Sequence, residues 1–166
     1  MTIQQTIQSQ YHAALEMLRQ AINHCPDQLW DEAENKNRFW HVAYHALFYT
    51  HLYLQPAESD FIPWERSEKD DHYLGPTPRM PDIKPEIERP YSRAELLEYL
   101  DLVRQQVDST VDRLDFAGPS GFSWLPFNKL EVQFYNLRHL QHHAGELCER
   151  LWAEAEIEIG WVGRRP

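Results

Sequence analysis

The sequence predicts an all-α protein built as a four-helix bundle, and three observations carry this prediction. Four segments repeat apolar residues at intervals of three and four, which places those residues on one face of a helix. No window alternates apolar and polar residues over the length of a strand. A proline-rich stretch separates the second periodic segment from the third, so one connection is long. The length of 166 residues suits one core, and we expect a single domain over residues 1–166.

The first two helices are marked by apolar faces and by the prolines that follow them. The first is predicted from Ile3 to Ile22, and Pro26 cannot continue it. The second is predicted from Asn37 to Leu54, and Pro56 closes it. The second helix is the most apolar of the four, so we expect it to lie centrally. Its wide apolar stripe consists of Phe39, Trp40, Ala43, Tyr44, Leu47, Phe48 and Leu52.

Residues 56–90 form the long crossover between the second and third helices. Regular hydrogen bonding is interrupted there by Pro63, Pro76, Pro78, Pro81 and Pro85. Loops of this length are uncommon in compact domains unless they are functional or disordered. Packing against the bundle is indicated by Phe61, Trp64, Tyr73 and Leu74. We therefore expect the crossover to cover a site.

The last two helices each begin at a capping signal. Ser92 followed by Glu95 is the signature of a capping box, and apolar residues at helical spacing continue from there to Leu114. A Gly-Pro-Ser-Gly stretch then breaks the chain. Asn128 offers the N-cap of the fourth helix, which is predicted over residues 130–155.

Charge and composition exclude two classes of partner. The 16 basic and 26 acidic residues give a formal charge of -10, which would repel a nucleic-acid backbone. No stretch reaches eighteen consecutive apolar residues and the N-terminus is polar, so we expect no membrane association and a cytoplasmic location. Cys25 and Cys148 match neither a CxxC metal pair nor a disulfide framework, and both are expected to be reduced.

The nine histidines are unevenly distributed over the predicted helices. His139 and His143 are four residues apart on the fourth helix, so their side chains rise about 6 Å apart from one face and can converge on one metal. A third ligand has to come from another element, and His45 on the second helix could meet the pair across the bundle. A buried histidine is more often an ordinary core residue. The spacing alone leaves a metal site and a core role about equally supported.

The sequence lacks the histidine motifs of several known classes of metal and haem site. The HExxH motif of zinc peptidases needs a glutamate where this chain has Leu140, and the HxxEH order fails because His142 stands at its glutamate position. The second and fourth helices contain no ExxH pair, so a di-iron carboxylate centre is not indicated. The absence of CxxCH excludes covalent c-type haem.

Two segments resemble the DinB-like family. Phe39–Tyr49 (FWHVAYHALFY) is similar to the second helix of DinB-like proteins, and Asn136–Leu147 (NLRHLQHHAGEL) is similar to their last helix. The resemblance extends over the whole chain in helix order and crossover length, although only these two segments are specific. It implies a DinB-like bundle in which His45, His139 and His143 bind one divalent metal.

Several neighbours of these ligands have roles that the sequence leaves open. His41 shares a face with His45 and competes for the second-helix position, whereas His142 points about 100° away from His143 around the helix. Five further residues are within a turn or two of the ligands and could orient them, or could be ordinary surface and core-edge residues: Tyr49, Tyr135, Asn136, Arg138 and Glu146.

The resemblance also implies a chemistry. Relatives with known activity are thiol-dependent transferases or isomerases, in which the metal binds a low-molecular-weight thiol and directs it at a small electrophile. Three histidines leave a coordination position open, as in catalytic zinc sites; zinc or nickel is expected, and iron or manganese would also fit. The alternatives are a non-catalytic stress-related module with a structural metal and a metal-dependent hydrolase that uses bound hydroxide. Many relatives pair through bundle helices, so a homodimer is expected.

Overall fold

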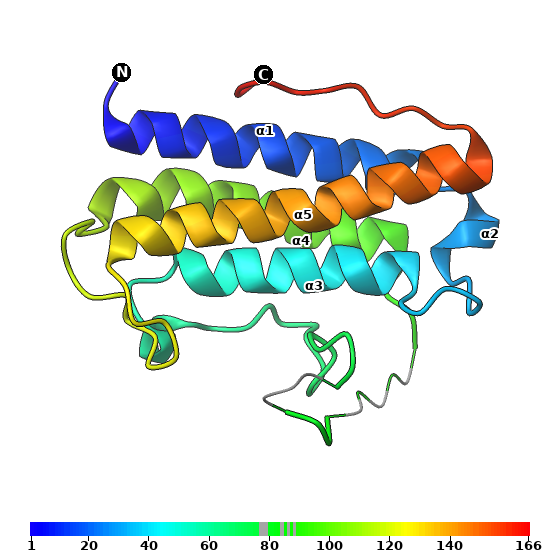
Figure 1. The fold of residues 1–166 in the computed structure, drawn as a ribbon, viewed down its shortest axis with the longest axis horizontal. Coiled ribbons are helices and arrows are strands. Elements are labelled where there is room, and N and C mark those ends of the chain that lie inside the picture. Colours follow the sequence, from blue (N-terminus) through cyan, green and yellow to red (C-terminus); the bar gives the residue numbers. More distant parts are fainter. Residues whose placement is uncertain (77–79, 84, 86, 88) are drawn as a thin grey trace.

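The computed structural model describes the whole chain except residues 77–79, 84, 86 and 88 (Figure 1). Its described residues form helices and no strand, so the predicted all-α fold is confirmed. Four long helices lie in the four segments where the sequence predicts them: α1 (Ile3–His24), α3 (Phe39–Leu54), α4 (Arg93–Thr110) and α5 (Lys129–Ala155). Both α1 and α3 pack against α4 and α5, while α1 and α3 meet only weakly across the diagonal.

Side chains cap three of these helices at their first turn. The predicted capping box of α4 is present, because Ser92 accepts from the Glu95 amide and the Glu95 side chain accepts from the Ser92 amide. The predicted cap of α5 is also present, since Asn128 accepts from the amide of Glu131. A third cap was not predicted: Thr2 and Gln5 form a capping box on α1.

Three short elements were not predicted. A four-residue helix, α2 (Asp27–Trp30), interrupts the connection after α1, and a 3₁₀ turn, η1 (Glu58–Asp60), follows α3. The apolar repeat that continues to Leu114 leaves the α-helix after Thr110 and tightens into a second 3₁₀ turn, η2 (Val111–Arg113), and Leu114 itself has extended backbone. Elements this short contain too few residues to show a helical period.

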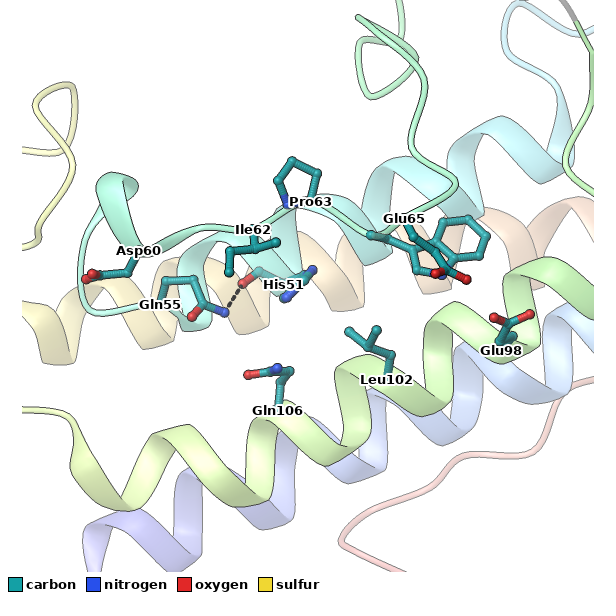
Figure 2. Close-up of a pocket in the computed structure, with 10 residues that line it drawn as sticks. His51, Gln55, Asp60, Ile62, Pro63, Glu65, Glu98, Leu102 and Gln106 are labelled. Atoms are coloured by element: carbon teal, nitrogen blue, oxygen red, sulfur yellow. Dashed lines mark hydrogen bonds between the residues drawn. The ribbon is translucent and has the colours of Figure 1, made fainter.

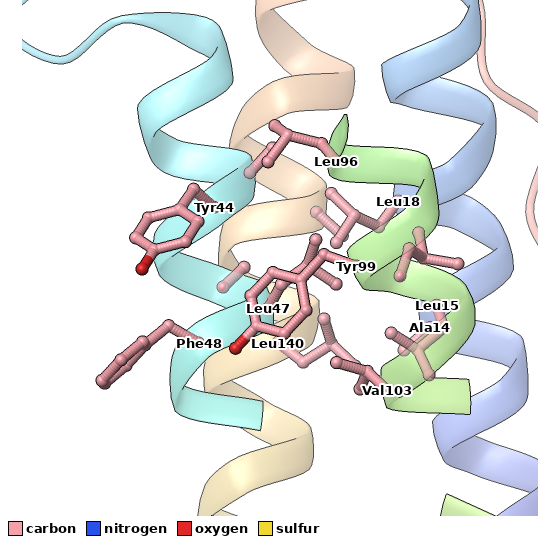
Figure 3. Close-up of a cluster of buried hydrophobic side chains, with 14 of the residues drawn as sticks. Ala14, Leu15, Leu18, Tyr44, Leu47, Phe48, Leu96, Tyr99, Val103 and Leu140 are labelled. Atoms are coloured by element: carbon pink, nitrogen blue, oxygen red, sulfur yellow. The ribbon is translucent and has the colours of Figure 1, made fainter. Parts of the chain in front are cut away.

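The core is filled by large side chains from all four long helices (Figure 3). Leu15 and Leu18 of α1 face Leu47 of α3, Tyr99 of α4 and Leu140 of α5, and all five are fully buried. This single cluster fixes α3 and α5 side by side, which positions the histidines of both helices.

We expected α3 to lie centrally because it is so apolar, but the structure gives a different reason for its apolar character. Every residue of α3 except His45 and Tyr49 is buried. The helices cover one side of α3 and the crossover covers another, where Phe61 packs edge-on against Phe48 with ring centroids 5.2 Å apart. Two-sided burial therefore explains the wide apolar stripe.

The crossover packs along the bundle. Trp64 is buried and stacks on Tyr99 of α4 with ring centroids 4.6 Å apart. The Tyr91 hydroxyl donates to the Arg66 carbonyl and accepts from the Glu68 amide. Pro78, one of the prolines that predicted the crossover, is outside the described residues. No helix in the described part of the chain combines the length and the apolar character that crossing a membrane requires.

Candidate metal centre

The three histidines predicted as ligands come together between α3 and α5. His45, His139 and His143 each offer one nitrogen, and these atoms lie within 4.8 Å of one another. The Nε2 atoms of His45 and His139 are 3.0 Å apart. Two nitrogens bound to one tetrahedral zinc ion would lie about 3.3 Å apart, so the spacing is close to that of a metal site.

Hydrogen bonds assign the proton on two of the three imidazoles. Nδ1 of His45 donates to the carbonyl of His72 over 2.6 Å, and Nδ1 of His143 donates to the Glu146 carboxylate over 3.0 Å. Carbonyl and ionised carboxylate oxygens only accept, so each Nδ1 carries the hydrogen. The Nε2 atoms of His45 and His143 are then left with lone pairs, which is the form that binds a metal.

The surroundings of His139 also suit a bound cation. Its Nδ1 is buried and has no partner among the described residues, while its Nε2 faces the lone pair of His45. Burial lowers the pKa of His139 to about 4 and that of His45 far below its usual value. Both imidazoles are therefore neutral at pH 7. Two facing nitrogens need a proton or a cation between them, and neutral imidazoles suit a divalent first-row metal.

A model of the DinB superfamily matches residues 10–147. The chain belongs to the DinB superfamily. The match includes both segments on which the resemblance rests and all three histidines. Searches of curated proteins and of solved structures found no match. For this DinB superfamily chain, the family match shows the superfamily, and the geometry shows a histidine group that could hold a metal; neither names the metal or a reaction.

The crossover of this DinB superfamily member forms hydrogen bonds with two histidines of α3. Nε2 of His41 donates to the carbonyl of Asp71 over 2.7 Å, directly before the His72 carbonyl that binds His45. Two histidines one turn apart on α3 thus bind two consecutive carbonyls of the crossover. His41, the competing ligand in the sequence analysis, is directed at the crossover instead of the cluster. No sequence signal marks these carbonyls, because any residue supplies one.

Aromatic rings surround the cluster. Tyr49 is half-buried, with its ring centroid 4.8 Å from that of His45 and 5.4 Å from that of His139. His72 stacks on Phe48 at 4.1 Å, and burial lowers the pKa of His72 to about 4. Burial also raises the pKa of Tyr49, so its phenol is neutral. The cluster therefore lies among uncharged rings.

The other residues proposed to orient the ligands have different places. Asn136 is fully buried and donates to the carbonyl of Thr50, which ties α5 to the last turn of α3. Tyr135 packs edge-on against Tyr53. Among the described residues, Glu146 forms a hydrogen bond with one of the three histidines and Tyr49 forms ring contacts with two of them. The His72 carbonyl is a further neighbour that the sequence did not suggest.

A second group of possible ligands adjoins the cluster, and the structure also has a separate cavity. His142, His143 and Glu146 also hold their donor atoms within 4.8 Å of one another, and His142 is exposed. A cavity of about 370 Å³ lies elsewhere, between the crossover and α4 (Figure 2). Its lining includes His51 and Glu98 but none of the three clustered histidines. The cavity is therefore distinct from the candidate metal centre.

Proposed function

We propose that this DinB superfamily protein is a metal-dependent enzyme, a thiol-dependent transferase or isomerase whose metal ligands are His45, His139 and His143. The observation that carries the proposal is the convergence of three imidazoles, two of which have lone pairs fixed by hydrogen bonds. Three protein ligands leave room for a small molecule in the fourth position. A bound divalent ion, zinc or nickel before iron or manganese, would lower the pKa of a coordinated low-molecular-weight thiol.

The chain's own cysteines support a thiol that arrives as a cosubstrate. Burial raises the pKa of Cys25 to about 12 and also raises that of Cys148, so neither is a thiolate at neutral pH. Neither belongs to a group of possible metal ligands among the described residues. In the proposed reaction the cosubstrate thiol loses its proton and its sulfur forms a bond to an electrophilic carbon. The bond from that carbon to a leaving group breaks, or a double bond at that carbon opens, and the group that takes the electron pair receives the proton.

The protein residues contribute orientation and exclusion of water. The His72 carbonyl and the Glu146 carboxylate hold two ligands in fixed tautomers. Tyr49 and the crossover border the cluster, and holding the thiol near the electrophile converts a bimolecular step into one within a complex.

The test is the consumption of bacillithiol, mycothiol, glutathione and cysteine with a model electrophile. Metal-loaded protein should speed the loss of at least one thiol, and His45→Ala should abolish the effect. A Cys25→Ser/Cys148→Ser double variant should keep full activity, because the reacting sulfur is not its own. If metal is bound and no thiol is consumed faster, a structural metal that joins α3 to α5 is the better account. Hydrolysis of an ester without any thiol would instead support a hydrolase.

A further inference from the structure

The His143 imidazole is held by a carboxylate from its own helix. Glu146 follows it by three residues, which places the two side chains on the same face of α5. Oε2 of Glu146 lies 3.0 Å from Nδ1 of His143. The contact can form only with the hydrogen on Nδ1, since the other tautomer would set a lone pair against a carboxylate oxygen.

Arg150 holds the same carboxylate from its other side. Nη2 of Arg150 lies 3.6 Å from Oε1 of Glu146, and Nη1 donates to the Asn37 carbonyl over 2.8 Å. Only 10% of the Arg150 side chain is exposed, so the guanidinium is fixed between α5 and the segment that leads into α3. Both oxygens of Glu146 are therefore engaged, one by Arg150 and one by His143.

This arrangement competes with a second metal site. The group of His142, His143 and Glu146 could hold an ion only if Nδ1 of His143 gave up its hydrogen, because that nitrogen is the one facing Glu146. His142 is exposed and would bring a well-hydrated ligand to such a site. The hydrogen bond to Glu146 needs no such change and leaves Nε2 of His143 for the cluster with His45.

We propose that Glu146 is a positioning residue for the candidate metal centre. It keeps His143 in the Nδ1–H tautomer, directs the Nε2 lone pair at the point shared with His45 and His139, and makes that nitrogen a better donor. Arg150 orients Glu146 for this role. The inference rests on the proposed function to the extent that the three histidines bind a metal, and it assigns a part to two residues that supply no ligand atom.

The test measures the affinity of metal-free protein for Zn²⁺ and Ni²⁺ by competition with a chromophoric chelator. Glu146→Leu removes both the acceptor and the charge, and it should weaken binding roughly 10- to 100-fold. Glu146→Gln keeps a carbonyl oxygen that can accept from Nδ1, so its loss should be smaller. Glu149→Gln is the matched control, because Glu149 is exposed on the same helix, and its affinity should equal that of the unchanged protein.

A second readout separates positioning from general damage. Long-range ¹H–¹⁵N spectra of metal-free protein should show His143 with its hydrogen on Nδ1, and Glu146→Leu should lose this preference while Glu146→Gln retains it. Unchanged affinity in Glu146→Leu, or a hydrogen on Nε2 in the unchanged protein, would overturn the inference alone. Binding of two ions, one of which is lost in Glu146→Leu, would also overturn it in favour of the second site. If metal binds as expected but no thiol reacts, the proposed chemistry fails and the role of Glu146 stands.

Discussion

Among single residues, His51 shows what burial does to a histidine outside the proposed metal cluster. Only 4% of it is exposed, its Nδ1 lies 3.3 Å from the Tyr99 hydroxyl, and its ring packs edge-on against Phe61. Burial lowers its pKa from 6.5 to about 4. Between these values the unfolded chain binds a proton that the folded chain does not. The contribution of His51 to stability is therefore complete above pH 6.5 and decreases as the pH falls toward 4.

This sign leads to a test in metal-free protein. Lowering the pH from 7 to 5 should cost about 2 kcal/mol of unfolding free energy through His51 alone. His51→Gln should lose that much less stability than the unchanged protein over the same interval, as measured by urea unfolding at both pH values. His24→Gln, a change at an exposed histidine of α1, should keep the original pH dependence. An equal pH loss in His51→Gln would show that His51 is protonated in the folded state.

Residues differ in how far the sequence reveals their roles. His139 and His143 could be predicted because a spacing of four puts them on one helical face. His45 could be predicted because it lies on the apolar second helix, and the resemblance then implied the same residue. The carbonyl of His72 could not be nominated, since it belongs to the backbone of an irregular segment. The role of Arg150 could not be predicted either, because its position beside Glu146 also depends on its hydrogen bond to the carbonyl of Asn37.

For the helices as elements, α4 depends on the capping box at its start. The Ser92 hydroxyl accepts from the Glu95 amide, and the Glu95 carboxylate accepts from the Ser92 amide over 2.8 Å. Ser92→Ala should therefore lower the unfolding free energy by about 1 kcal/mol in urea denaturation. Ser123→Ala, at an exposed loop position, should change it little. Equal effects of the two substitutions would mean that water replaces the cap.

The long helices were predictable and the short ones were not, for one physical reason. α1 and α5 repeat their apolar faces over several turns, so the period is visible along the sequence. α2 has four residues, and its place depends on contacts such as the bond from the Trp30 indole to the Tyr91 carbonyl. The packing of the crossover on α3 is also a tertiary effect. The apolar composition of this helix indicated that it is buried, and we interpreted this as a central position.

At the scale of the whole molecule, the expected homodimer has a candidate surface on α5. Phe134 and Trp152 are more than half exposed, and their separation of 18 residues is five helical turns, which puts them on one side. We expect light scattering to give twice the chain mass of 19.8 kDa. A Phe134→Ser/Trp152→Ser double variant should shift the mass toward one chain. A mass of one chain for the unchanged protein at tens of micromolar would contradict the dimer.

The central claim is that one divalent ion binds where α3 and α5 meet, and metal analysis of purified, reloaded protein tests it most directly. We predict one equivalent per chain, and a large loss in His139→Ala and in His143→Ala, because removing either half of the pair on α5 leaves too few ligands. His142→Ala is the control and should keep one equivalent, since His142 is exposed outside the cluster. Loss of the metal in His142→Ala but not in His143→Ala, or no bound metal at all, would contradict the account.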